Sequence, residues 1–273
     1  MPESVAEACE LLAADRGLVP VAGGTDLYVH WPQGFDERAA SYLDLSGLAA
    51  ELKPIRWRDD ELVLGALTTY WDVIGDRRVG EEFPLLVKAA RQVGAIQIQT
   101  RGTWAGNIAN ASPAADGVPV LMAYDAVVEL VAHSGCEEIP LEEFYLGYKQ
   151  MRRRPDQLIR AIRLPRREYQ VELFEKVGAR QAQAITKVGV AVTRSAAGWR
   201  VVANSVAPTV CRCPALEGLL AQGATVASPE DLLPAIRRDV SPIDDIRSTA
   251  EYRERVMARV LYHGLRDVCL GFC

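Results

Sequence analysis

The segment from Gly94 to Pro119 constrains the fold of this 273-residue chain more than any other. It contains four glycines and two prolines, with small and polar residues between them. It is too long for a simple connection, and long ordered loops in compact domains are usually functional. The sequence therefore predicts a functional ordered loop between a helix at 83–93 and a strand at 126–132.

A second glycine-rich segment, Val21 to Leu27, follows an apolar run at 18–22 that predicts a buried strand. Glycine lets backbone amides approach an anion closely, and consecutive amides form an anion-binding concavity. The two segments are interpreted either as a clamp around one pyrophosphate or as ordinary turns. Neither is a G-x-G-x-x-G or G-x-x-x-x-G-K-[ST] motif, so a Rossmann-type or Walker-type site is not predicted.

Hydrophobic periodicity indicates an α+β chain. The Ser4-x-x-Glu7 pattern predicts a capping box for a first helix at 4–16. A polar break at Arg166-Arg167-Glu168 predicts a boundary between domains at 1–168 and 169–273. The other expected elements are strands at 42–45, 61–65, 158–164, 171–177, 188–194 and 199–206, and helices at 69–75, 215–221, 229–238 and 249–268.

Composition narrows the class of protein. The 49% hydrophobic and 25% charged residues exclude a disordered or collagen-like chain. A net charge of −5 argues against nucleic-acid binding, which needs a positive field. No apolar run is long enough to span a membrane, and the acidic N-terminus is not a signal peptide, so a cytoplasmic protein is expected.

The cysteines and histidines do not have the spacing of a metal site. Zinc sites need paired ligands at short intervals, and Cys211-x-Cys213 is a single pair at another spacing. We therefore expect free thiols and no metal in this chain. The residues concerned are Cys9, Cys136, Cys211, Cys213, Cys269, Cys273, His30, His133 and His263.

With these motifs in place, the chain resembles the FAD-binding medium subunit of molybdenum hydroxylases, the group of xanthine dehydrogenase and aerobic carbon monoxide dehydrogenase. Residues 21–27 match the family's A-G-G-x-[ST/D]-L motif, and residues 101–116 match R-G-T-I-G-G-N-I-A-N-A-S-P-A-A-D. Residues 174–188 and 242–253 resemble its C-terminal domain. One departure is Trp104-Ala105 in place of Ile-Gly: a Cβ at Ala105 removes space and penalises positive φ, and Trp104 either covers the flavin or fills the core.

The resemblance implies a two-subdomain FAD-binding domain of the vanillyl-alcohol-oxidase/PCMH type, followed by a smaller α+β domain. It implies electron transfer from [2Fe–2S] clusters of a partner subunit, through FAD, to NAD, oxygen or a quinone-linked acceptor. The partners would be a large molybdenum-binding subunit and a small [2Fe–2S] subunit, assembled as a dimer of heterotrimers. FAD would be non-covalent, because the first glycine-rich segment has no His or Cys for attachment.

The resemblance also implies the residues that bind FAD. Asp116 would accept hydrogen bonds from a sugar or ribityl hydroxyl, and Lys176 would stabilise negative charge on the flavin. No catalytic residue and no metal ligand is expected. The implied cofactor-binding residues are Val21, Ala22, Gly23, Gly24, Thr25, Asp26, Val93, Gly94, Thr103, Trp104, Ala105, Gly106, Asn107, Asp116, Ile159, Lys176 and Ile185.

Three questions stay open at this point. The chain could be a stand-alone flavin oxidoreductase of the same fold, or a non-catalytic assembly protein that has lost FAD. The basic stretch from Lys149 to Arg167 is either a solvated face or a docking surface for an acidic partner.

Overall fold

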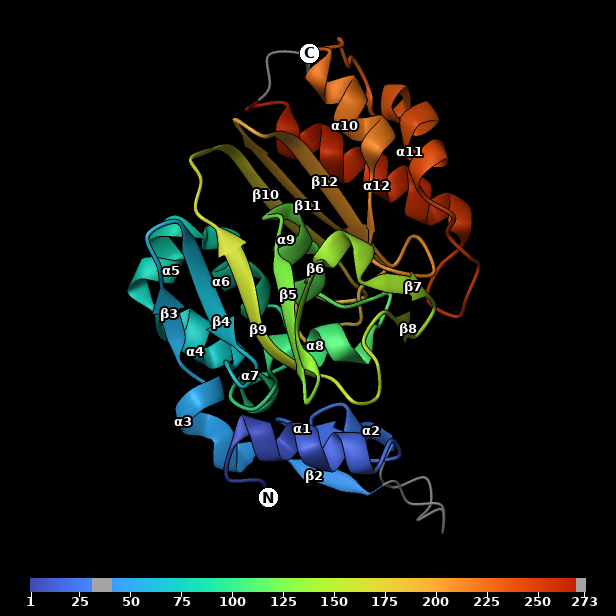
Figure 1. Ribbon diagram of the computed structural model, residues 1–273. Coiled ribbons are helices and arrows are strands. Elements are labelled where there is room, and N and C mark those ends of the chain that lie inside the picture. Colours follow the sequence, from blue (N-terminus) through green and yellow to red (C-terminus); the bar gives the residue numbers. More distant parts are fainter. Residues whose placement is uncertain (31–40, 269–273) are drawn as a thin grey trace.

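The computed structural model describes residues 1–30 and 41–268. Figure 1 shows three parts that follow one another along the chain: an N-terminal unit, a central sheet with its helices, and a C-terminal sheet with its helices. The N-terminus lies at one end of the molecule and the helices of the C-terminal part lie at the other. No helix within the described ranges is long and apolar enough to cross a membrane.

The N-terminal unit is built on a short parallel strand pair. Its elements are α1 (Val5–Ala14), β1 (Val19–Val21), α2 (Leu27–His30), β2 (Tyr42–Asp44), a 3₁₀ turn (Ser46–Leu48) and α3 (Ala49–Leu52). Ser4 caps α1 as predicted, but the Glu7 carboxylate accepts from the Glu3 amide at 2.7 Å instead of completing the capping box on Ser4. The predicted strand at 18–22 forms, but it is only half-buried.

The central part is a five-stranded antiparallel sheet in the order β3-β4-β9-β5-β6. One face of β5 is buried because apolar residues occur at alternate positions, with Val128 and Leu130 inside. A separate hairpin, β7–β8, precedes β9 along the chain. The strands are β3 (Ile55–Trp57), β4 (Glu61–Gly65), β5 (Val127–Ala132), β6 (Gly135–Pro140), β7 (Tyr145–Gly147), β8 (Gln150–Met151) and β9 (Leu158–Pro165).

Helices cover one side of this sheet (Figure 1). Thr69 caps the first of them, where a helix at 69–75 was expected, and the structure shows that the cap is a full capping box with Asp72. The segment at 94–119, predicted to be a loop, instead contains three short helices, because Thr103 caps one of them and Gly117 begins another. The helices are α4 (Tyr70–Gly75), α5 (Arg77–Glu82), α6 (Pro84–Ala90), α7 (Ile96–Gln99), α8 (Trp104–Asn110) and α9 (Gly117–Ala123), and a 3₁₀ turn (Leu141–Glu143) follows β6.

The C-terminal part is a four-stranded antiparallel sheet, β10-β11-β12-β13, with helices on one face. Almost every residue of β11 is buried, because Val190 belongs to a core with the C-terminal helices while Ala191 belongs to the core of the central part. The elements are β10 (Tyr169–Val177), β11 (Val188–Ser195), β12 (Gly198–Asn204), β13 (Cys211–Arg212), α10 (Pro214–Ala221), a 3₁₀ turn (Pro229–Leu232), α11 (Leu233–Asp239) and α12 (Ala250–Leu265).

The two larger parts share buried surface. Phe174 and Val202 of the C-terminal sheet belong to the same hydrophobic core as the central sheet. The polar segment 166–168 lies between β9 and β10. A domain boundary at 168 stays a prediction, since the core continues across it.

Candidate functional site

A cavity of about 640 Å³ lies between the N-terminal unit and the central part. Its wall on one side is the segment that follows β1, and on the other side the residues around α7, α8 and the start of β9. This explains why β1 is only half-buried. The predicted cofactor-binding residues that line the cavity are Val21, Ala22, Gly23, Gly24, Thr25, Asp26, Val93, Thr103, Ala105, Gly106, Asn107 and Ile159.

The two glycine-rich segments touch each other at this cavity. A Cβ on Gly23 would lie 1.8 Å from the carbonyl oxygen of Arg101, so only glycine permits the observed approach. Gly24 has a φ of +69°, a conformation that L side chains rarely adopt. The two segments therefore meet at this cavity through a direct backbone contact.

The segment after β1 presents a row of amides without protein acceptors. Among the described residues, no backbone or side-chain oxygen accepts a hydrogen bond from the amides of residues 22–26. Across the cavity, the amides of Thr103 and Ala105 also lack an acceptor within the described ranges. Buried backbone donors are normally paired, and residues 22–25 are half-buried while Asp26 is exposed, so these amides are open to a ligand or to water. Unpaired donors on both walls of one cavity fit an anionic ligand held between them.

The glycine-rich segment around Thr103–Asn107 forms the start of helix α8, whereas the segment at 22–26 has no regular structure. The Thr103 hydroxyl accepts from the Gly106 amide at 2.9 Å and begins α8. Ala105 lies in the first turn and is not among the described residues with positive φ, so its Cβ causes no backbone strain. The departure from glycine at this position is therefore compatible with the site.

Trp104 fills the core. Its side chain is fully buried, it packs on Tyr70 with ring centroids 5.0 Å apart, and it does not line the cavity. Of the two roles considered for this residue, the structure supports packing.

Three polar side chains close one side of the cavity. The Asn110 amide donates to the Asp26 carboxylate at 2.9 Å. Lys149, in the turn between β7 and β8, donates to the Asn110 side-chain oxygen at 2.5 Å and to its backbone oxygen at 2.7 Å. This chain of contacts joins the N-terminal unit, the end of α8 and the β7–β8 hairpin.

Asp116 lies outside the cavity lining. Its carboxylate pairs with Lys176 at 2.6 Å and accepts a hydrogen bond from the Thr186 hydroxyl, and both of these residues belong to the C-terminal part. Although Asp116 precedes α9, its side chain makes no capping bond to that helix. Burial raises the pKa of Asp116, and Lys176 and Thr186 oppose that rise.

Three more residues that the resemblance implies, Gly94, Lys176 and Ile185, also do not line the cavity. Gly94, with a φ of +51°, packs against Ile98, and Ile185 is 59% exposed on the C-terminal part. Lys176 additionally donates to the Gln92 carbonyl at 2.9 Å. The cofactor contacts expected of Gly94, Trp104, Asp116, Lys176 and Ile185 stay predictions.

Sequence reasoning missed more than half of the lining residues, among them Tyr70, Lys149 and Arg153. Tyr70 followed a helix cap and looked like an ordinary core residue. Lys149 and Arg153 were only members of a basic stretch, and no spacing in the sequence separated them from the other cations. Their place in the cavity depends on how the β7–β8 hairpin folds back, which no local pattern encodes.

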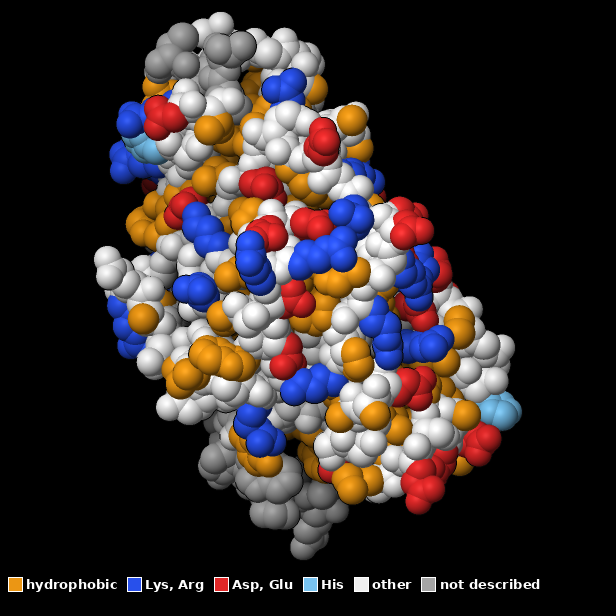
Figure 2. All heavy atoms as spheres, turned by 90° about the vertical axis from the view of Figure 1, so that its left-hand side faces the viewer, with side chains coloured by type: hydrophobic (Ala, Val, Ile, Leu, Met, Phe, Trp, Pro, Cys, Tyr) orange, Lys and Arg blue, Asp and Glu red, His pale blue; other side chains and the backbone are white. Residues whose placement is uncertain are grey.

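Most of that basic stretch is paired with acids. Arg163 lies 2.5 Å from Glu138, Arg166 lies 2.7 Å from Glu82, and Arg160 lies 3.2 Å from Glu129. Figure 2 shows the same interleaving of positive and negative side chains over one side of the molecule. The geometry therefore favours a solvated, charge-balanced face over a positive docking surface.

The described residues contain no candidate metal site. No group of three or more His, Cys, Asp or Glu side chains there could hold an ion. Cys9, Cys136, Cys211 and Cys213 are free thiols, while Cys269 and Cys273 lie outside the described residues.

Comparison with known proteins identifies the family to which the chain belongs. The model described as "FAD binding domain in molybdopterin dehydrogenase" matches residues 1–167, and "CO dehydrogenase flavoprotein C-terminal domain" matches residues 174–268. The caffeine dehydrogenase subunit beta of a Pseudomonas species is 30% identical, covering 95% of this chain and 90% of that one. The putative xanthine dehydrogenase FAD-binding subunit of Escherichia coli is 28% identical over 92% of this chain and 88% of its own.

A solved structure agrees with these matches. A chain of carbon monoxide dehydrogenase from Hydrogenophaga pseudoflava superposes with a TM-score of 0.88 at 26% identity, covering 98% of this chain and 95% of that one. The α+β fold with a C-terminal flavoprotein domain is confirmed by this likeness. The chain therefore belongs to the family of FAD-binding medium subunits of molybdopterin dehydrogenases, the xanthine and carbon monoxide dehydrogenase type.

Proposed function

We propose that this chain carries one non-covalent FAD and passes electrons from the [2Fe–2S] clusters of a partner subunit to an external acceptor. The observation that carries the proposal is the row of unpaired amides at residues 22–26, which faces a second glycine-rich wall across the cavity. When bound, FAD supplies the redox chemistry, and the protein supplies binding, orientation and electrostatics.

The residues present fit such a cofactor. The amides on the two walls provide donors for a diphosphate, and the close contact of Gly23 with Arg101 fixes the distance between the walls. Apolar residues such as Ile159 and Val93 line other parts of the cavity, where they exclude water from the rings of the ligand. Asp26 is held by Asn110, so its carboxylate is directed by a protein donor.

The remaining residues of the motif enter this proposal on the resemblance alone. Asp116 would bind a sugar or ribityl hydroxyl, and Lys176 would stabilise negative charge on the flavin. Gly94 and Ile185 would pack near the cofactor. In the present geometry the Asp116 carboxylate already pairs with Lys176, so a cofactor hydroxyl would have to share it.

The partners and the acceptor belong to the same proposal. A large molybdenum-binding subunit and a small [2Fe–2S] subunit would complete a dimer of heterotrimers, and NAD, oxygen or a quinone-linked compound would accept the electrons. The alternatives are a stand-alone flavin oxidoreductase of this fold and an assembly protein without FAD. The unpaired amides favour a flavoprotein over the second alternative, because an empty site gains nothing from unpaired donors.

The binding part is tested at Gly24. Asn and Asp both tolerate positive φ better than other side chains, so Gly24→Asn and Gly24→Asp form a matched pair that differs in charge. Gly24→Asp places a carboxylate against the diphosphate, so it is expected to fold and purify without the flavin absorption near 450 nm, whereas Gly24→Asn keeps part of it. Unchanged flavin content in Gly24→Asp would contradict this site. Flavin that remains with the protein after acid precipitation would contradict non-covalent binding.

The electron-transfer part is tested by purification of the complex. Subunits that carry molybdenum and iron–sulfur clusters should co-purify with this chain, and the chain alone should not oxidise purines, aldehydes or carbon monoxide. Substrate oxidation by the isolated chain would instead support the stand-alone oxidoreductase.

A further inference from the structure

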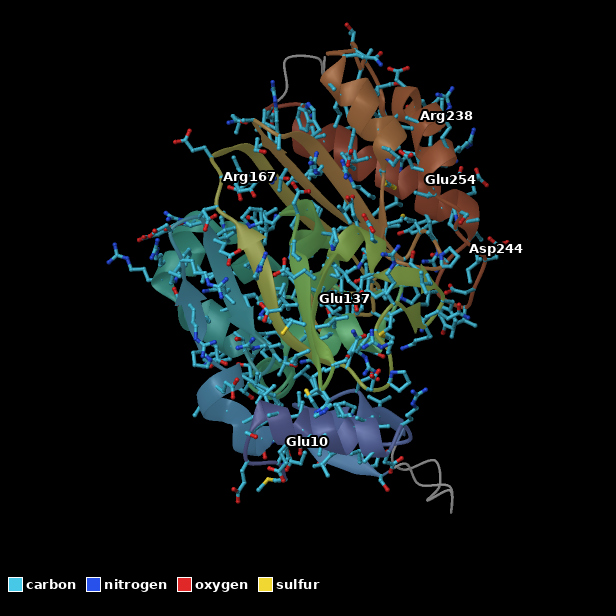
Figure 3. All side chains as sticks on the ribbon, in the orientation of Figure 1. Glu10, Glu137, Arg167, Arg238, Asp244 and Glu254 are labelled. Carbon is cyan, nitrogen blue, oxygen red and sulfur yellow. The ribbon has the colours of Figure 1, made fainter. Side chains whose placement is uncertain are left out.

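Two of the eight cations between Lys149 and Arg167 differ from the rest. Six of them pair with a carboxylate, in bridges such as Arg152 with Glu143 at 3.2 Å. Lys149 and Arg153 have no carboxylate partner among the described residues, and they are also the two that line the cavity. Figure 3 labels one of the paired cations, Arg167, where β9 approaches the C-terminal sheet, far from this cavity.

Lys149 is already engaged, because it donates to two oxygens of Asn110. Arg153 is different. Its Nη1 donates to the carbonyls of Gln157 at 2.8 Å and Arg154 at 3.2 Å, which anchors one edge of the guanidinium. Its Nε is buried without a partner, and its Nη2 has no acceptor among the described residues.

The electrostatic surroundings of Arg153 leave a positive charge uncompensated. Burial lowers the pKa of Arg153, and Asp156 opposes that change. Asp156 is itself paired with Arg154 at 3.1 Å, so it is not a free counter-ion. Removing a cation from water without an anionic partner is costly, which makes an unpaired guanidinium at a cavity wall unusual.

The charge of the ligand would supply the missing partner. Neither an adenine ring nor an oxidised flavin ring carries a net negative charge, whereas the diphosphate that links them is anionic. Arginine is well suited to this role because its planar N–H groups match phosphate oxygens. The amides of residues 22–26 that would bind the same group line the same cavity.

We propose that Arg153 binds the diphosphate of the flavin dinucleotide and gives the cavity its preference for FAD over a flavin without phosphate. This assignment rests on the proposed FAD function. Arg153 would act as the fixed cationic partner of the two loops, which contribute only neutral backbone donors.

The test uses the full chain stripped of flavin. FAD and riboflavin are titrated into wild type, Arg153→Gln and Arg153→Lys, with quenching of flavin fluorescence as the readout, at several salt concentrations. Arg152→Gln is the matched control, because it removes the same charge one residue away at an exposed ion pair. Melting temperatures of the flavin-free proteins show that each variant is folded.

Loss of a hydrogen bond to a charged group should weaken FAD binding about 10- to 100-fold in Arg153→Gln. Riboflavin affinity should change less than about twofold, and the salt dependence of FAD binding should become shallower, because screening acts on the lost charge. Arg153→Lys should lie between, and Arg152→Gln should match wild type.

Two results would overturn the assignment. Unchanged FAD affinity and salt dependence in Arg153→Gln would remove Arg153 from the site. Equal weakening of FAD and riboflavin with an unchanged salt slope would indicate a ring contact or a packing role. The salt slope for FAD decides the matter even where riboflavin binds too weakly to titrate. If wild type bound no FAD, the proposed function itself would fail, which is a separate outcome.

Discussion

The central part meets its two neighbours through two different kinds of contact. Toward the C-terminal sheet the junction is rich in satisfied polar bonds, such as Asp116–Lys176 at 2.6 Å and Arg200–Asp125 at 2.6 Å. There the Asn204 amide also donates to the Ala115 carbonyl at 2.7 Å. Toward the N-terminal unit, Gly23 packs closely on the Arg101 carbonyl, beside amides without protein acceptors and beside Arg153, which has no carboxylate partner among the described residues.

The difference distinguishes a junction that only joins two parts of the protein from a junction that also forms a ligand site. Buried polar groups that only join two parts of a protein are paired within the protein, since each unpaired group costs stability. The cavity junction has a row of amides without protein acceptors and the unpaired Arg153 Nε, which a ligand can satisfy, whereas at the C-terminal junction the unpaired buried atoms are the Tyr169 hydroxyl and Asn204 Oδ1. The comparison predicts that variants at the C-terminal junction mainly lower stability, and that variants at the cavity junction mainly lower FAD affinity.

Asp116→Ala should have the largest effect on stability. It leaves the buried Lys176 without a carboxylate, with only the Gln92 carbonyl as acceptor, and breaking a buried ion pair from one side typically costs about 3–5 kcal/mol. Denaturant unfolding of the flavin-free protein measures this cost. The double variant Asp116→Ala/Lys176→Met removes the stranded cation and should recover part of the loss.

FAD titration of the same variants below their melting transitions adds a second readout. A loss of FAD affinity in Asp116→Asn, which keeps the shape and an acceptor, would support the sugar-hydroxyl role. A flavin-free Asp116→Ala as stable as wild type would contradict the distinction between the two junctions.

Gly23→Ala should have the next largest effect on stability, and it should act mainly on binding. The new Cβ would meet the Arg101 carbonyl oxygen at 1.8 Å, so the two walls must separate. We expect FAD affinity to fall more than about 100-fold, while overpacking lowers stability by about 1–3 kcal/mol. Gly75→Ala is the control, because nothing lies within 4 Å of its new Cβ. Full FAD affinity in Gly23→Ala would show that the glycine contact does not set the site.

Thr103→Ala should have an intermediate effect. It removes the hydroxyl that accepts from the Gly106 amide, and loss of an N-cap costs about 1 kcal/mol. The start of α8 forms a cavity wall, so FAD affinity should fall modestly along with the melting temperature. Thr103→Ser keeps the cap and should restore both. If Thr103→Ser behaves like Thr103→Ala, the loss of FAD affinity and of melting temperature does not come from the lost N-cap.

Ala105→Gly should have the smallest effect. Ala105 lies in the first turn of α8, so restoring the family's glycine adds backbone freedom to the unfolded chain and costs about 0.5–1 kcal/mol. FAD affinity should stay within about twofold of wild type, as measured by the same titration. A large gain in affinity would mean that the Cβ of Ala105 does crowd the cofactor.

Much of the fold follows from local patterns. The strands at 127–132 and 158–165 and the helix capped by Thr69 could be predicted because apolar spacing and a cap act within a few residues. The three short helices that begin in the segment at 94–119 could not, because each spans at most about two turns, too few for helical periodicity to be recognised, and depends on caps and packing for its stability.

The amino-acid sequence by itself determined the family, the two glycine-rich segments and fewer than half of the residues that line the cavity. The motifs can be recognised in the sequence because their residues are close together along the chain. Gly23 and Gly24 mark positions where the backbone needs a close contact or a positive φ. Only the tertiary structure decided the rest: Trp104 packs in the core, Asp116 pairs across a junction with Lys176, and Arg153 alone among the neighbouring arginines faces the cavity. Those outcomes depend on contacts between segments that are far apart in the chain. Which side chains pair and which become buried is decided by how these segments pack, and no local sequence pattern specifies that.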